Sequence, residues 1–165
     1  MLAAITIRFL YCYSCFKPMT LINSAANENI KRWRKISEHP RGAKKIGTTL
    51  AEGIHLAEVI CEKRPETRAV VVRENNVHPD VHALAERVAE ETGAKFLTVA
   101  DKLYDAVCPV ENGTGIMVEV AVEFAQRPMQ PIAEDALYLD GVQDAGNMGT
   151  LIRTALAAGV RHIAA

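Results

Sequence analysis

A glycine-rich loop near the carboxyl-terminal end of the sequence contains the residues best suited to chemistry. Three glycines lie within residues 140–149, and glycine lets the backbone approach a ligand more closely than a Cβ atom would allow. Asn147 is placed to cap a helix over residues 150–158, and Arg153 falls in its second turn, within reach of the loop. The loop matches neither the GxGxxG nor the Walker pattern, so it predicts no dinucleotide or triphosphate site. The alternative interpretation is a capped helix with one surface arginine.

Basic residues gather in an earlier segment, residues 20–50. That segment has seven basic and two acidic residues, which gives +5, whereas residues 51–165 have ten basic and eighteen acidic residues, which gives −8. Such an asymmetry suggests a polyanion-binding patch on an acidic body, although a solvated helix face is the alternative. We expect contacts with RNA phosphates from the basic residues of this segment: Lys31, Arg32, Arg34, Lys35, Arg41, Lys44 and Lys45.

Other residues that could bind a metal do not form a complete site. Cys12 and Cys15 form a CxxC, and His78 and His82 are four residues apart, but neither pair has the further ligands that a tetrahedral zinc site needs. No metal is therefore expected. The remaining cysteines lie among apolar residues and are expected to be small buried side chains: Cys61 and Cys108.

The elements that position these residues follow from the apolar pattern. Apolar residues recur at helical spacing in residues 27–36, 50–61 and 81–89. Pro79 is expected to begin the third of these helices and Gly93 to end it, while Asp101 is expected to cap a short helix that runs to Val107. Strands are predicted for residues 69–72, 95–99 and 116–122, and the first of them should be buried on both faces. This order predicts an α/β domain with a largely parallel sheet.

A second domain is predicted after residues 126–134, which contain two prolines and no periodicity and are typical of a linker. Residues 136–139 are predicted to form a strand, followed by the glycine-rich loop and its helix, and residues 160–165 are predicted to begin another strand. A unit of about thirty residues cannot bury its own faces, so the sequence is expected to be truncated within this domain.

Composition sets the broad class of the protein. Of 165 residues, 49% are hydrophobic and 24% are charged, which excludes a disordered, collagen-like or coiled-coil chain. Residues 1–18 are apolar and aromatic, but too short to span a bilayer and without the features of a signal peptide. We expect them to be an extension outside the fold, with a membrane-associating segment as the alternative. No other segment could cross a membrane, so a cytoplasmic protein without a membrane partner is expected.

The glycine-rich loop resembles the first motif of the SpoU (TrmH-type) RNA 2′-O-ribose methyltransferases. Residues 139–155, LDGVQDAGNMGTLIRTA, follow the family pattern LDxVxDPxNxGxIxRTA, with Ala145 where proline is usual. Upstream, INSAANENIK at residues 22–31 and LAEGIH at residues 50–55 resemble the opening segments of the family's substrate-binding domain. The turn NGTGI at residues 112–116 takes the place of the family's PQGI turn.

The resemblance implies a fold and a domain division. Residues 19–125 would form an RNA substrate-binding α/β sandwich like that of the kink-turn-binding ribosomal proteins. Residues 126–134 would be the linker, and residues 135–165 the start of a SPOUT (α/β knot) methyltransferase domain. Residues 1–18 would remain outside both.

The resemblance also implies an activity. The family transfers a methyl group from S-adenosylmethionine to a ribose 2′-hydroxyl, usually as a homodimer and without a metal. By motif matching, Asn147 and Arg153 correspond to active-site residues, with the arginine holding a phosphate or the forming alkoxide and the asparagine orienting the loop. Ribosomal RNA is favoured over transfer RNA as substrate. The motifs that bind the methyl donor are expected beyond Ala165, so this chain alone is expected to be inactive. The alternative function is a non-catalytic RNA-binding module.

Overall fold

The computed structural model describes residues 20–39, 41–76, 78, 80–122, 133–142 and 144–164. The chain divides into two compact units, Met1–Phe124 and Ala125–Ala165, and each is described by itself. The predictions for residues 1–18, for the Cys12–Cys15 pair, for Pro79 and for most of the linker lie outside the described residues.

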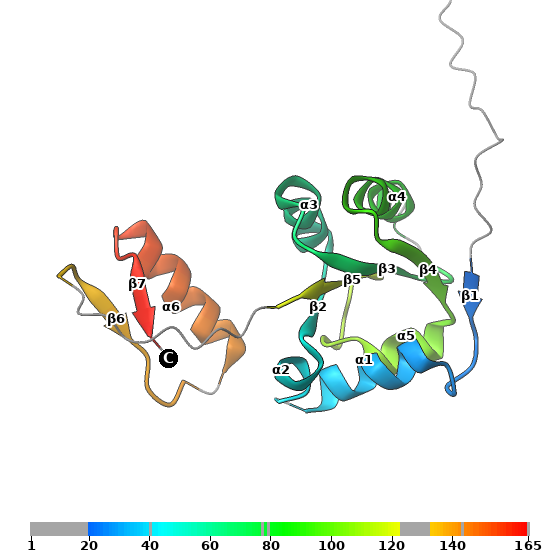
Figure 1. Cartoon of the computed structure of the whole chain (residues 1–165), viewed down its shortest axis with the longest axis horizontal. Coiled ribbons are helices and arrows are strands. Elements are labelled where there is room, and N and C mark those ends of the chain that lie inside the picture. The colour runs from blue at the N-terminus through cyan, green and yellow to red at the C-terminus, as the bar shows by residue number, and fades with distance from the viewer. Residues whose placement is uncertain are drawn as a thin grey trace, which may run out of the picture. The chain divides into compact units, whose positions relative to one another are not determined.

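The first unit contains a mixed sheet. In spatial order its strands are β1 (Thr20–Ile22), β4 (Lys95–Val99), β3 (Thr67–Arg73), β5 (Ile116–Ala121) and β2 (Thr48–Glu52) (Figure 1). The first three are parallel, but β5 runs antiparallel to both β3 and β2, so the prediction of a largely parallel sheet is wrong. The seven-residue helix α5 (Asp101–Val107) after β4 spans only about 10 Å. Ile116, the first residue of β5, pairs with Val72, so β5 begins at the carboxyl end of β3 and runs back along it.

Helices cover both faces of this sheet and make an α/β sandwich, as expected. Helices α1 (Glu28–Glu38), α2 (Gly42–Ile46) and α5 lie on one face, and α3 (Ile54–Lys63) and α4 (Asp80–Thr92) on the other (Figure 1). In β3, Val71 packs into the core beneath α1, whereas Val70 and Val72 pack into the core beneath α3 and α4. Strand β3 is thus buried on both faces, which confirms that prediction. Two cysteines are only partly buried at the edges of these cores: Cys108 in the first and Cys61 in the second.

The predicted helix over residues 50–61 is wrong in its first part. Leu50 lies in β2, where it pairs with Glu119 of β5, and helix α3 begins only at Ile54. Thr48 and Leu50 are buried and Thr49 between them is less so, which is the two-residue period of a strand. Gly53 has a φ of 117°, a conformation that suits glycine and turns the strand into the helix.

The second unit has the predicted strand–loop–helix–strand order. Parallel strands β6 (Ala136–Tyr138) and β7 (His162–Ala164) are joined through helix α6 (Ala145–Ala157). Large apolar side chains remain exposed in this unit, with Tyr138 72% and Leu156 66% exposed. In the described parts of both units, no helix combines the length and apolarity needed to cross a bilayer.

Candidate nucleic-acid interface

Helix α1 presents basic residues because its apolar residues are buried. The side chain of Asn27 caps the helix by accepting a hydrogen bond from the backbone N–H of Asn29 at 2.9 Å. Its buried face consists of Ile30, Trp33 and Ile36. The helical period then directs the charged side chains on the rest of the helix outward.

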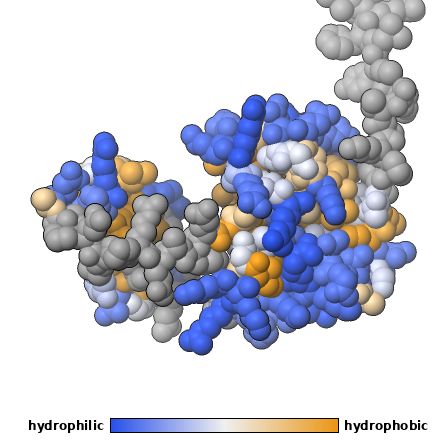
Figure 2. All heavy atoms as spheres, in the orientation of Figure 1, coloured by the Kyte–Doolittle hydropathy of each residue, from blue (hydrophilic) through white to orange (hydrophobic). Residues whose placement is uncertain are grey.

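Helix α2 lies against the end of α1. A Cβ atom on Gly42 would collide with the carbonyl oxygen of Lys35, so only glycine allows this close approach. Gly47, with a φ of 76°, ends the helix by donating its N–H to the carbonyl of Ala43 at 2.8 Å. The close packing brings the basic residues of both helices into one region, which Figure 2 shows as hydrophilic side chains along the lower edge of this unit.

We call six of these residues the basic surface: Lys31, Arg34, Lys35, Arg41, Lys44 and Lys45. Lys31 pairs with Glu28 at 2.7 Å, and Arg34 lies 3.7 Å from Glu38. Both pairs are exposed, so a phosphate could replace the carboxylate at little cost. The other four residues have no ion-pair partner among the described residues.

Arg32, the seventh predicted RNA contact, has a different environment. Its Nε and Nη2 atoms donate to the two carboxylate oxygens of Glu119 at 2.9 and 2.7 Å. Glu119 is fully buried and also accepts from Trp33 Nε1 at 2.8 Å and from Thr48 Oγ1 at 3.0 Å. Arg32 therefore attaches α1 to the sheet, and its contact with a phosphate stays a prediction.

Burial of Glu119 acts to raise the pKa of this carboxyl, but the hydrogen bonds and charge that surround it outweigh burial and lower it. Sequence reasoning missed this residue. The available signal was an acidic side chain within the apolar strand IMVEVA, because a buried carboxylate needs partners.

The glycine-rich loop joins β6 to α6, and its helix begins earlier than expected. Asp144 caps α6, since its Oδ1 accepts from the backbone N–H of Asn147 at 2.6 Å. The prediction that Asn147 caps a helix from residue 150 is therefore wrong. The helix begins at Ala145, which places Asn147 in its first turn with an exposed side chain.

Arg153 folds back along α6 toward the start of the helix. Its Nη2 donates to Thr150 Oγ1 at 3.2 Å, and its Nη1 lies 3.0 Å from the position that a Cβ atom of Gly149 would occupy. Asn147 and Arg153 are six residues apart, or about 9 Å along the helix axis, and no hydrogen bond joins these two described residues. Their catalytic roles stay predictions.

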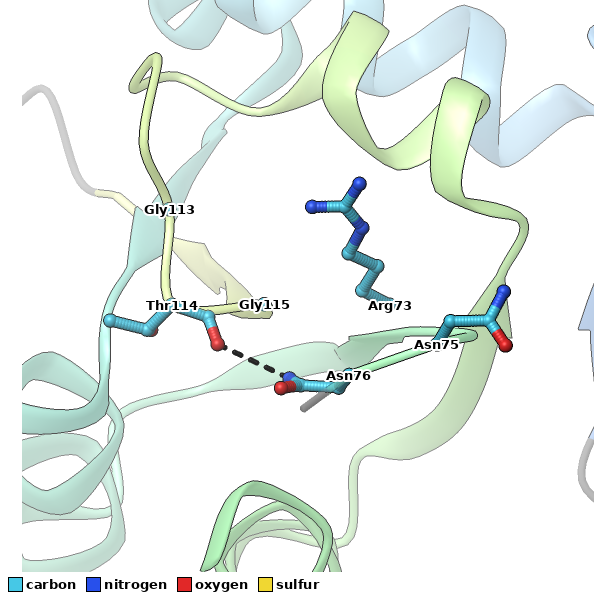
Figure 3. A pocket seen from close by; sticks show the side chains of 6 residues that line it. All are labelled: Arg73, Asn75, Asn76, Gly113, Thr114 and Gly115. Carbon is cyan, nitrogen blue, oxygen red and sulfur yellow. Dashed lines mark hydrogen bonds between the residues drawn. The ribbon is translucent and has the colours of Figure 1, made fainter. Parts of the chain in front are cut away.

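A polar pocket of about 240 Å³ lies in the first unit at the carboxyl end of β3 (Figure 3). Its walls are Arg73 of β3, the following loop, and the turn before β5: Asn75, Asn76, Gly113, Thr114 and Gly115. Asp101, expected to cap α5, instead lies in its first turn after the cap Ala100 and accepts from Asn75 and Arg73. These interactions lower the pKa of Asp101. Within the described residues, no group of three histidine, cysteine or acidic side chains could hold a metal ion.

Comparison with known proteins places these features in a family. The MRM3-like substrate binding domain matches residues 27–118. The 23S rRNA (guanosine(2553)-2′-O)-methyltransferase RlmP of Bacillus subtilis is 32% identical over 143 residues, covering 86% of this chain and 52% of that protein. An uncharacterized tRNA/rRNA methyltransferase of Synechocystis is 28% identical over 155 residues, covering 92% of this chain and 54% of that protein.

Solved structures share the fold. An rRNA methyltransferase from Sinorhizobium meliloti has a TM-score of 0.66 at 24% identity, covering 88% of this chain and 54% of that one. An RNA 2′-O ribose methyltransferase has a TM-score of 0.64 at 21% identity, with 87% and 54% covered. The chain thus spans about half the length of the relatives that it matches. It carries an MRM3-like substrate-binding domain and belongs to the SpoU (TrmH-type) RNA 2′-O-methyltransferase family, as its motifs predict.

Proposed function

We propose that this chain supplies the RNA-recognition domain and the first catalytic motif of an rRNA 2′-O-ribose methyltransferase. The observation that carries the proposal is the family match over residues 27–118, together with the motif from Leu139 to Ala155. The name of the Bacillus subtilis relative favours ribosomal RNA over transfer RNA as the substrate. Because the chain spans about half of its relatives, we propose methyl transfer for a full-length protein that includes this chain and acts as a homodimer.

The first unit would bind RNA through the basic surface. Lys35 and Lys44 are exposed and carry long flexible side chains on two helices that pack together. Ammonium groups of this kind bind phosphate without reading sequence, and each contact releases counterions from the nucleic acid. The basic surface would therefore supply affinity for RNA and would orient the bound RNA, while selectivity for a particular RNA sequence would come from other residues.

The variant with both Lys35→Ala and Lys44→Ala should bind RNA more weakly and with a weaker dependence on salt. Each lost phosphate contact should flatten the log–log salt slope by about 1, so the double variant should lose about 2. The measurement is fluorescence anisotropy with a labelled 23S rRNA fragment over a range of salt concentrations. Lys95→Ala, an exposed lysine at the start of β4, is the matched control. An unchanged slope in the double variant would contradict phosphate binding by this surface.

In the proposed reaction, the 2′-oxygen of a ribose forms a bond to a methyl group as the bond from that methyl to the donor's sulfur breaks, and the hydroxyl proton is released to solvent. Arg153 is the proposed stabiliser of the negative charge that develops on this oxygen, because a guanidinium stays cationic and its N–H groups form a fixed fork. Asn147, in the first turn of α6, is proposed to orient the loop that precedes this helix. Both side chains are exposed on α6, where RNA could reach them.

S-adenosylmethionine is the proposed methyl donor, as the relative from Sinorhizobium meliloti has been solved with AdoMet bound. The pocket beside α6, about 290 Å³, does not fit this molecule. Thr154 has the one polar side chain among its lining residues, whereas the donor carries a carboxylate, an ammonium and a sulfonium group. We therefore assign no donor-binding residue in this chain.

The 165-residue chain alone should neither bind S-adenosylmethionine nor methylate RNA. A ligand that touches one loop and an apolar surface gains too little contact to offset the freedom that it loses on binding. Isothermal titration of the chain with the donor should give no saturable heat, and the full-length protein serves as the positive control. Saturable one-to-one binding by this chain would contradict the prediction.

A non-catalytic RNA-binding module is the second candidate function. It is favoured by the separate hydrophobic cores of the first unit, which contain residues of that unit alone. A binding module has no use for Asn147 and Arg153, so measuring methyl transfer in the full-length protein distinguishes the two functions.

A further inference from the structure

The polar pocket at the end of β3 has walls that are fixed by hydrogen bonds. Glu52, the last residue of β2, accepts from the backbone N–H and the hydroxyl of Thr114, and Asn76 donates from Nδ2 to the carbonyl of Thr114 at 3.2 Å (Figure 3). The backbone N–H of Arg73 donates to the carbonyl of Gly115 at 3.0 Å. Two separate segments, the end of β2 and the stretch from Arg73 to Asn76, thus hold the turn before β5 in one conformation.

Two glycines make this arrangement possible. A Cβ atom on Gly113 would collide with the carboxylate of Glu52, and one on Gly115 would collide with the amide of Asn76. Gly115 also has a φ of 87°, which other residues rarely adopt. Glycine at both positions therefore brings the turn against these side chains and leaves an opening between the turn and Arg73.

The charges around the pocket disfavour a phosphate. Arg73 Nε lies 3.2 Å from Asp101 and its Nη2 lies 3.1 Å from Asp105, and Glu52 adds a third carboxylate at the turn. One guanidinium beside three carboxylates leaves a local charge of −2 at neutral pH, opposite in sign to the basic surface. The RNA backbone should be repelled here, whereas a neutral group with several donors and acceptors should be accepted.

The guanidinium of Arg73 is held in place by two carboxylates that occupy only some of its N–H donors. Its side chain is 35% exposed, and its carboxylate partners use Nε and Nη2. For Nη1, no hydrogen bond to another described residue is present. A planar guanidinium offers both an edge of N–H donors, which pairs with the acceptors of a base, and a face on which a base stacks.

The size of the pocket restricts the ligand further. At about 240 Å³ it is smaller than the roughly 300–1,000 Å³ of sites for drug-sized ligands and cofactors. We propose that this pocket receives a single unpaired base of the RNA, and this inference rests on the proposed function. Strand β2 connects α2 to Glu52 over five residues, about 15 Å. One RNA segment could therefore place phosphates on the basic surface and a base in the pocket.

The experiment uses the full chain labelled with ¹⁵N and the four free ribonucleosides, which carry no phosphate. At least one nucleoside should shift the amide resonances of Asn76, Thr114 and Gly115 in a saturable way, while ribose and ribose 5-phosphate should not. Arg73→Lys keeps the charge but removes the planar fork, and should weaken that nucleoside about tenfold. Arg68→Lys, an exposed arginine on the same strand, is the matched control and should change the affinity less than about twofold.

The proposal is overturned if no nucleoside shifts these resonances, if ribose 5-phosphate binds there as well as a nucleoside, or if Arg73→Lys leaves the affinity unchanged. If Arg73→Lys disturbs the loop before ligand is added, Asn76→Ala tests the opposite wall and should show the same loss. The Lys35→Ala and Lys44→Ala changes should leave nucleoside binding intact. If the protein binds RNA in a salt-dependent way but binds no nucleoside, only the proposal of a base pocket is refuted. If it binds a nucleoside but no RNA, the result counts against the proposed function.

Discussion

Replacing Glu119 by glutamine should lower the free energy of unfolding of the first unit by about 3 kcal/mol, the lower end of the range for breaking a buried ion pair. The buried carboxylate accepts four hydrogen bonds, two of them from Arg32. A glutamine amide has one acceptor oxygen and turns an NH₂ group toward donors that need an acceptor. Arg32 is partly exposed and could turn to water, but Trp33 and Thr48 are buried and bond to different carboxylate oxygens, so the single amide oxygen cannot accept from both.

Fluorescence of Trp33 during urea unfolding measures this effect directly, because it is the one tryptophan of the sequence and lies buried in the same unit. Glu62→Gln, an exposed acid on α3, serves as the control and should change the unfolding free energy by less than about 0.5 kcal/mol. A similarly small effect for Glu119→Gln would show that this network does not stabilise the fold.

Glu119 should also make the free energy of unfolding depend on pH in the acidic range. Its pKa is lowered in the folded protein, so its stabilising contribution is complete above the unfolded value, about 4.3, and is lost as the pH falls through the folded pKa. The difference in stability between the wild type and Glu119→Gln should therefore shrink below about pH 4. A difference that stays constant down to pH 2 would contradict the assignment.

The secondary structure could be predicted from the sequence wherever the apolar residues followed a single pattern, either that of a helix or that of a buried strand. The apolar residues of α1, at Ile30, Trp33 and Ile36, and the continuous apolar run of β3 each fit a single element. Residues 48–61 could not be divided correctly, because Leu50 and Ala57 fit a helical spacing by coincidence and a strand joins the helix at Gly53. The direction of β5 depends on how far α5 carries the chain, and periodicity contains no such information.

The candidate site could be predicted as far as residue type allowed. Charge identified the basic surface, and the motif identified Asn147 and Arg153, but only the structure shows that Arg32 is bonded to Glu119. These two residues are 87 positions apart, so no local pattern connects them. The capping role expected of Asn147 belongs to Asp144 for a similar reason. Aspartate and asparagine both cap helices well, so residue type alone does not determine whether Asp144 or Asn147 caps α6.

In a full-length methyltransferase that includes this chain, Arg153→Ala should lower the rate of methyl transfer by about 10²–10³, the usual cost of removing one group that stabilises developing negative charge. The fold should survive, since Arg153 is exposed and its side chain bonds among the described residues only to Thr150, within its own helix. RNA affinity should also persist, because the basic surface belongs to the first unit. The measurement is transfer of a labelled methyl group to 23S rRNA under single-turnover conditions.

Two further variants make the role of Arg153 specific. Arg153→Lys keeps a positive charge but lacks the planar fork of the guanidinium. If charge alone stabilises the 2′-oxygen, Arg153→Lys should be faster than Arg153→Ala. If the geometry of the guanidinium is required, the two variants should have similar rates. Arg161→Ala removes an exposed arginine from the same unit and should leave the rate within about twofold of the wild type. Near-normal turnover of Arg153→Ala would reduce this residue to a surface arginine on a capped helix. In that case, stabilisation of the 2′-oxygen would have to come from residues outside the first motif.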